Sequence, residues 1–136
     1  MIDLRIDIDV ENLDRGIEFY TQALGLKVGR RLGHDWAELL GAPAPIDLLA
    51  KAPGTAASPA SPQRREYVRH WTPVHLDFVV SDLDAAVQRA RAAGAALEGE
   101  IQERKWGRMA NMADPFGHGL CLLEFRGRGY DEIISS

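Results

Sequence analysis

The sequence contains a repeat at an offset of 70 residues, which limits the possible folds more than any other feature. The stretch PVHLDFVVSDLD (73–84) alternates polar and apolar residues and leads into a helix start, and RIDIDV (5–10) has the same design. Three residue pairs keep the offset: Asp7 and Asp77, Leu13 and Leu83, and Asp14 and Asp84. A fixed offset with matching polarity indicates two copies of one structural unit.

The first copy is predicted to be a βαβββ module. Its opening strand, residues 4–10, places apolar residues on one face and charged residues on the other. Asn12 is a suitable N-cap for the helix that follows, and Gly25 is placed to end it. Three short strands are expected after this helix: residues 27–32, 36–40 and 46–50.

The second copy is predicted to repeat this plan. A strand over 74–80 precedes a helix that Ser81 or Asp82 caps and that Gly94 ends. The turn DPFG (114–117) comes before the last strand, because proline presets φ and glycine tolerates a positive one. The strands that follow the helix are expected near 96–102, 108–113 and 119–125.

We therefore expect a single α+β domain with two tandem modules, residues 1–50 and 73–126, and a surface tail over 127–136. The linker (51–72) contains KAPGTAASPASP, a composition that buries too little apolar area to fold by itself, and is predicted to be mobile. Each mixed sheet would have a helix on its outer face. The two remaining faces would close into a cup that holds a ligand.

Composition excludes several kinds of partner. The net charge of −4 favours neither nucleic acid nor an anionic membrane, and no apolar run is long enough to span a bilayer. The lone Cys121 excludes an intrachain disulfide and is typical of a reducing compartment. Met1 leads directly into a strand pattern with charges, which is not a signal peptide. We expect a cytoplasmic protein.

Polar residues on the two opening strands are the first site candidates. If the apolar faces lie under the helices, then Arg5, Asp7, His75 and Asp77 project into the cup. By the same alternation Asp47 and Cys121 point inward, although a register shift of one residue would reverse this.

Three segments resemble the vicinal oxygen chelate superfamily. VENLDRGIEFYTQALGLKV resembles its opening strand and helix, VHLDFVVSDLDAAVQRARAAGA its second module, and ADPFGHGLCLLEF its final turn and strand. This superfamily includes glyoxalase I, extradiol dioxygenases, fosfomycin-modifying enzymes and bleomycin-binding proteins. The resemblance therefore implies a fold more strongly than a function.

The resemblance also implies where a metal ion would bind. Metalloenzymes of the superfamily take ligands from positions that correspond here to Arg5, Asp47, His75 and Cys121. A guanidinium stays protonated and has no lone pair to offer a cation, so we expect no metal cofactor. The alternative is a divalent metal held by Asp47, His75 and Cys121, since catalytic zinc commonly uses three protein ligands.

Two candidates have alternative roles. His75 is either a general base oriented by Asp77 or Asp7, or a satisfied histidine in a polar pocket floor. Arg5 either binds a carboxylate or phosphate of the substrate, or pairs internally with Asp47 or Asp7.

The predicted ligand-binding residues are Arg5, Asp7, Trp36, Asp47, Trp106, Arg108 and Cys121. Trp36 and Trp106 each either line the pocket or pack in a core. Nothing near Cys121 in the sequence lowers its pKa, so a small buried residue is favoured over a thiolate nucleophile.

Two functions are consistent with these features. The first is a glyoxalase-like enzyme of lyase or isomerase type, with His75 and Asp77 as catalytic residues and Arg5 or Arg108 holding an anionic group. The second is a metal-free protein that binds and sequesters an antibiotic or metabolite, as the bleomycin-resistance branch does. The resemblance also implies a homodimer, which light scattering would test.

Overall fold

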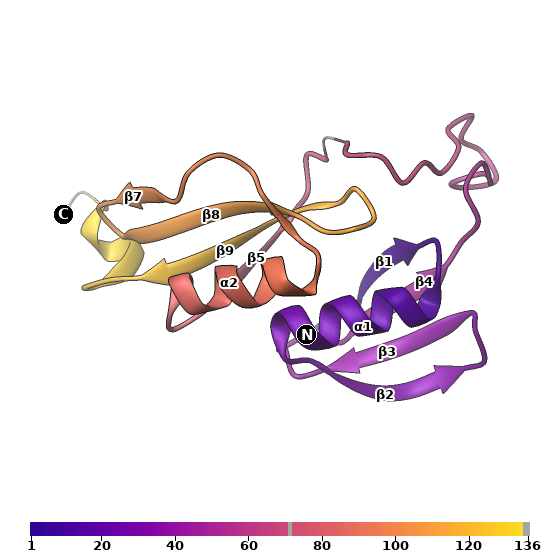
Figure 1. Ribbon diagram of the computed structural model, residues 1–136, viewed down its shortest axis with the longest axis horizontal. Helices are drawn as coiled ribbons and strands as arrows, with labels where there is room; N and C mark the ends of the chain where they lie inside the picture. The colour runs from indigo at the N-terminus through magenta and orange to yellow at the C-terminus, as the bar shows by residue number, and fades with distance from the viewer. Residues whose placement is uncertain (71, 135–136) are drawn as a thin grey trace. The chain divides into compact units, whose positions relative to one another are not determined.

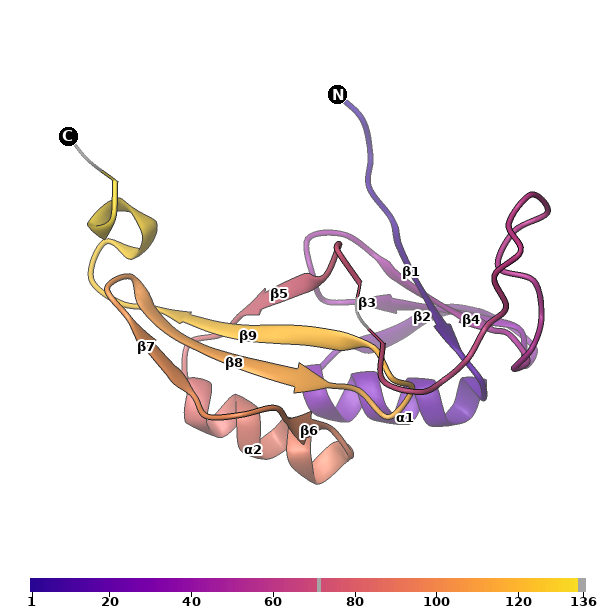
Figure 2. The same cartoon turned by 90° about the horizontal axis from the view of Figure 1, so that it is seen from above.

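The computed structural model describes residues 1–70 and 72–134, and the chain divides into two compact units (Figure 1). Unit 1 is Met1–Val68 and unit 2 is Arg69–Ser136. Each unit has one α-helix packed on one face of a mixed sheet, as Figures 1 and 2 show. The predicted α+β class with two βαβββ modules is therefore confirmed.

Unit 1 contains a four-stranded sheet and one helix. In chain order its elements are β1 (Ile6–Val10), α1 (Leu13–Leu24), β2 (Lys27–Leu32), β3 (Trp36–Leu40) and β4 (Ile46–Ala50). The strand order is β1-β4-β3-β2, with β1 parallel to β4 and the other pairs antiparallel. The Asn12 side chain accepts a hydrogen bond from the Arg15 N–H at 3.0 Å, and Gly25 ends the helix in a left-handed conformation.

The core of unit 1 lies between α1 and one face of this sheet. Phe19 and Tyr20 of the helix and Leu39 and Leu48 of the strands are almost fully buried. Burying a side chain of this size contributes about 1.5–3 kcal/mol to folding. Because side chains alternate along a strand, the other face carries the polar residues of β1, β3 and β4.

Unit 2 repeats the plan. Its elements are β5 (Leu76–Val79), α2 (Leu83–Ala93), β6 (Ala96–Leu97), β7 (Gln102–Arg104), β8 (Gly107–Ala113), β9 (Gly119–Phe125) and the 3₁₀-helix η1 (Gly129–Glu132). The strand order is β5-β9-β8-β6, and β7 pairs with β8. Asp82 is the N-cap of α2, with its carboxylate accepting from the Ala85 N–H, and Gly94 ends the helix. No helix among the described residues has the length and apolar character needed to cross a membrane.

Three predicted strand boundaries were wrong. β1 begins at Ile6 instead of residue 4, and β5 covers Leu76–Val79 instead of 74–80. Leu4 and Val74 lie just outside these strands and are exposed, so extending the strands to them would bury little apolar surface. The single strand expected near 96–102 is divided into β6 and β7, because Gly99 between them has a φ of 77°, which extended strands do not adopt.

The segment predicted as a mobile linker is hydrogen-bonded within itself and to β1. The backbones of Gly54 and Thr55 exchange hydrogen bonds with that of Arg65, which closes a loop. The Arg65 guanidinium also bonds Asp9 of β1 at 2.8 Å, and the Tyr67 hydroxyl donates to the Lys51 carbonyl. The composition of this segment gave no indication of these contacts.

Candidate functional site

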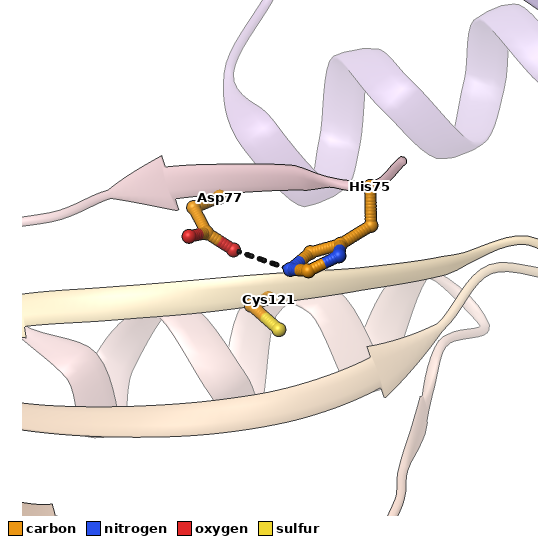
Figure 3. Close-up of side chains that lie close together, drawn as sticks. All are labelled: His75, Asp77 and Cys121. Carbon is orange, nitrogen blue, oxygen red and sulfur yellow. Dashed lines mark ion pairs between the residues drawn. The ribbon is translucent and has the colours of Figure 1, made fainter. Parts of the chain in front are cut away.

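Three polar side chains form a row across the sheet of unit 2, on the face away from α2. Asp77 of β5 lies opposite Cys121 of β9, and Cys121 lies opposite Asn111 of β8. Residues in register on neighbouring strands point to the same side of a sheet. His75, two residues before Asp77, joins the row at its end (Figure 3).

Two contacts connect these side chains. The His75 Nε2 lies 3.2 Å from the Asp77 Oδ1, and the Cys121 thiol donates to the Asn111 Oδ1 at 3.1 Å. Burial of the thiol, and then the negative charge of Asp77, raises the pKa of Cys121 to about 11. Cys121 is therefore a neutral, hydrogen-bonded thiol at physiological pH and not a thiolate nucleophile.

A cavity of about 370 Å³ opens beside this row. Its apolar wall includes Met109, Met112 and Leu120, and His75, Asn111 and Cys121 add polar groups. The other lining residues are Arg69, Thr72, Glu98 and Gly119. All ten lining residues belong to unit 2, so this unit forms the cavity by itself. Small-molecule sites typically combine an apolar wall with a few polar groups in this way.

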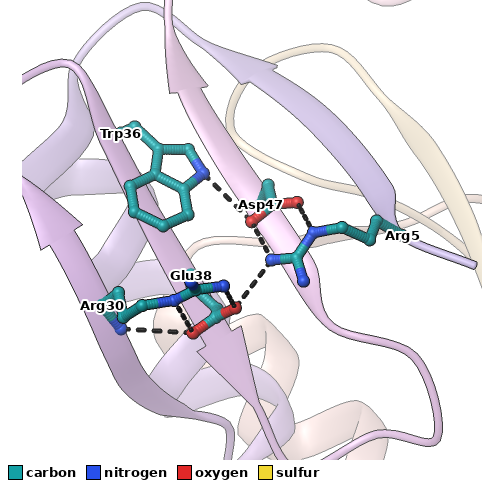
Figure 4. Close-up of polar contacts among 5 residues, drawn as sticks. All are labelled: Arg5, Arg30, Trp36, Glu38 and Asp47. Atoms are coloured by element: carbon teal, nitrogen blue, oxygen red, sulfur yellow. Dashed lines mark hydrogen bonds and ion pairs between the residues drawn. The ribbon is translucent and has the colours of Figure 1, made fainter.

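Unit 1 carries a separate polar cluster on the face of its sheet away from α1 (Figure 4). The Arg5 guanidinium bonds both oxygens of Asp47, at 2.9 and 2.8 Å, and one oxygen of Glu38 at 2.7 Å. The Trp36 indole N–H donates to Asp47 at 3.0 Å, and Arg30 bonds Glu38 from the other side. The carboxylates of Glu38 and Asp47 are buried, and each accepts hydrogen bonds from at least two other side chains.

These contacts fix the charges of the cluster. Hydrogen bonds from Arg30 and then Arg5 lower the pKa of Glu38 to about 2, and the bond from Arg5 lowers the pKa of Asp47. Burial, and then the hydrogen bond with Asp47, raises the pKa of Asp7. In this structure Arg5 therefore has the internal pairing that was one of its two predicted roles.

Two predicted ligand-binding residues lie away from the cavity of unit 2. Arg108 pairs with Asp84 of α2 at 2.8 Å and with Glu124 at 3.5 Å, and Glu124 in turn accepts the backbone N–H of Leu83. This network ties β8 and β9 to the start of α2. Trp106 packs edge-on against Phe125 and Tyr130, with ring centroids 5.8 and 5.3 Å away.

The model of the glyoxalase-like domain family matches residues 5–123, which is well over half of the chain. The chain belongs to this family. The resemblance to the vicinal oxygen chelate superfamily is thereby confirmed.

Solved structures share the fold of this chain. A glyoxalase/bleomycin resistance protein/dioxygenase family enzyme from Burkholderia phytofirmans PsJN has a TM-score of 0.71 at 18% identity, over 92% of this chain and 100% of that chain. TnmS3, an antibiotic binding protein from Streptomyces sp. CB03234, has a TM-score of 0.65 at 21% identity, over 93% and 97%. At such identities the likeness shows the fold alone.

One curated relative is similar to this chain over a short stretch. An uncharacterized protein of Mycobacterium bovis is 44% identical over 52 residues, which is 38% of this chain. The match spans about a third of the length of that relative, 34%.

The ligand positions that the glyoxalase-like family implies do not fit a metal ion in this chain. Arg5 has no lone pair, and its guanidinium occupies both oxygens of Asp47. In unit 2 the ligand atoms of His75, Asp77 and Cys121 lie within 4.8 Å of one another, a group of donors of the kinds that zinc accepts. A cation at that place would have to displace the thiol proton and separate the His75–Asp77 pair.

The sequence analysis identified part of the site in unit 2 and missed the rest. His75 and Cys121 line the cavity and Asp77 contacts His75, whereas Arg5, Asp7, Trp36 and Asp47 belong to unit 1. That the two groups share one cup stays a prediction. Met109 and Asn111 were missed, although the alternation of β8 places both on one face. No local pattern marks the pair formed by Arg69 and Glu98.

Proposed function

We propose that this chain binds a small organic molecule in the cavity of unit 2 and that it does so without a metal ion. The observation that carries the proposal is the cavity itself, because it combines about 370 Å³ with two methionines and a leucine beside a short polar row. Methionine side chains are flexible and polarizable, so they adapt to flat or irregular organic ligands. The description of TnmS3 as an antibiotic binding protein supports this class of function.

The metal-free part of the proposal rests on the donors. Arg5 is bonded to Asp47 and Glu38, which leaves the carboxylate predicted as a ligand already satisfied. Burial and the charge of Asp77 raise the pKa of the Cys121 thiol, so a metal ion would have to displace a proton that is held more tightly than in an ordinary cysteine. The predicted homodimer stays a prediction.

Methionine methyl NMR gives a local test of this proposal. The chain has three methionines, of which Met109 and Met112 line the cavity and Met1 is the first residue. In a screen of small organic molecules, a ligand should shift the ¹³C-methyl signal of Met109, which shares a face of β8 with Asn111, more than that of the fully buried Met112, and should leave that of Met1 unchanged. Asn111→Leu should weaken the same ligand about tenfold, because it removes a hydrogen bond to a polar group in the cavity.

The titration is repeated after treatment with EDTA. An unchanged affinity supports metal-free binding, and loss of binding that zinc restores would overturn it. Hits that shift only Met1, or that bind Asn111→Leu and the unchanged chain equally well, would contradict the location of the site.

A second function is favoured by one contact. The His75 Nε2 lies 3.2 Å from the Asp77 Oδ1, and both side chains are about 40% exposed, at 43% and 41%, next to the cavity. A carboxylate at this distance orients the imidazole, which suits His75 to move a proton to or from a bound substrate. This arrangement supports a glyoxalase-like lyase or isomerase.

Turnover of methylglyoxal–thiol adducts tests the enzyme function. His75→Ala should lower the turnover number by roughly 100-fold or more, the usual contribution of a general acid or base. Asp77→Asn should cause a smaller loss, because the imidazole keeps its place but loses the carboxylate that orients it. Activity that survives His75→Ala would show that this residue takes no part in the chemistry. Ligand binding without turnover would contradict the enzyme function and support binding as the only function.

A further inference from the structure

We propose that the cavity of unit 2 selects an uncharged, largely apolar molecule that carries a carbonyl group, and that the Arg69–Glu98 pair excludes anions. This inference rests on the proposed binding of a ligand in this cavity and names its chemical class.

The only described arginine that lines the cavity is already neutralised. The Arg69 Nε donates to the Glu98 Oε2 at 2.7 Å and its Nη2 donates to the Glu98 Oε1 at 2.9 Å. The remaining Nη1 donates to the backbone carbonyl of His70. A side-on bidentate pair of this kind uses the geometry with which arginine would otherwise hold a ligand carboxylate. A ligand anion would therefore have to displace Glu98.

Gly119 leaves room for the pair at the wall of the cavity. A Cβ atom at this position would lie 2.7 Å from the Nη2 and 3.0 Å from the Cζ of Arg69. Only a residue without a side chain thus allows the guanidinium to lie against the backbone of β9. Because Glu98 and Gly119 both line the cavity, the pair forms part of its wall.

Asp77 also accompanies the other group beside the cavity that could carry a positive charge. His75 is held by Asp77, so a protonated imidazole there would face a carboxylate at 3.2 Å. Arg69 and Glu98 cancel each other in the same way. The cavity therefore offers no uncompensated positive charge to repay the dehydration of an anion.

Asn111 supplies the polar contact that remains. Its Oδ1 accepts the Cys121 thiol, and none of the contacts found among the described residues uses its Nδ2. An amide N–H₂ is a donor, so it calls for an acceptor on the ligand. An uncharged carbonyl satisfies this donor, and Met109, Met112 and Leu120 cover the apolar remainder.

Two probes of nearly equal shape test the inference: 2-naphthamide, which is neutral, and 2-naphthoate, which is an anion. Both are titrated into the full chain near neutral pH while the methyl signals of Met109 and Met112 are followed. We expect 2-naphthamide to bind at least about tenfold more tightly than 2-naphthoate. Glu98→Gln should release Arg69 and raise the affinity for 2-naphthoate about tenfold, with little change for 2-naphthamide.

Glu100→Gln is the matched control. Glu100 lies two residues after Glu98 and carries the same charge, but its side chain does not line the cavity. It should leave both affinities unchanged. Arg69→Gln combined with Glu98→Gln should abolish the gain in 2-naphthoate binding.

The outcomes separate the two proposals. If the unchanged chain binds 2-naphthoate as tightly as 2-naphthamide, the ligand class is wrong although small-molecule binding stands, and this comparison needs no variant to fold. If Glu98→Gln folds, by its methyl spectrum, and gains no affinity for 2-naphthoate, the role of the pair is wrong. If neither probe moves the signals of Met109 and Met112, the ligand class is overturned together with the site.

Discussion

Iodoacetamide should alkylate Cys121 about 100-fold more slowly in the folded chain than in the unfolded chain near pH 8. Burial and the charge of Asp77 raise the thiol pKa from 9.0 to about 11. At a fixed pH below 9, each increase of one in this pKa lowers the thiolate fraction about tenfold. Since the chain has one cysteine, the reaction reports this thiol alone. The rate is measured by mass spectrometry with and without guanidinium chloride.

The pH dependence separates the raised pKa from simple shielding of the sulfur. If the pKa is responsible, the folded rate rises with pH well beyond the point at which the unfolded rate levels off. Asp77→Asn should accelerate the folded reaction, whereas Asp131→Asn, an equal charge change in η1, should not. A folded rate that levels off near pH 9 would show an ordinary thiol and would contradict the neutral role of Cys121.

The fold was largely predictable because its signals are local. Asn12 and Gly25 mark the ends of α1, and Asp82 and Gly94 mark the ends of α2, each through hydrogen bonds or φ angles of a few neighbouring residues. The three later strands of unit 1 match the predicted bounds because turn residues separate them. The start of β1 at Ile6 was predicted two residues too early, because no glycine or proline precedes it.

The site was predictable only where the two-residue period of a strand sufficed. His75 and Asp77 share a face for this reason, and the pairing of β5 with β9 then brings Cys121 beside them. Arg30 escaped prediction because the register of β2 shifts between Val28 and Arg31. Glu38 was missed although the two-residue period places it on the face of Trp36, opposite Asp47. The Arg69–Glu98 pair joins side chains far apart in the sequence, and no periodicity describes that.

Gly107→Ala should have the largest effect on stability, with a loss of about 3–5 kcal/mol of unfolding free energy. Gly107 has a φ of 150°, and a Cβ atom there would lie 1.9 Å from the Glu124 carbonyl oxygen. The new methyl group would force the start of β8 away from β9. The clashing oxygen belongs to the backbone, so it cannot move aside as a flexible side chain would. Denaturant unfolding measures the change.

Gly99→Ala provides the matched control for this prediction. Gly99 also has a positive φ, 77°, but a Cβ atom there meets nothing within 4 Å, so this variant should lose only the cost of backbone strain, about 1–2 kcal/mol. Gly107 begins the strand that carries Met109 and Asn111, so a Gly107→Ala variant that still folds should also lose ligand-induced shifts of Met109. Equal stability of the two variants would show that β8 and β9 do not approach as closely as the structure has them. The pairing register of these two strands, which carry the cavity wall, would then be wrong.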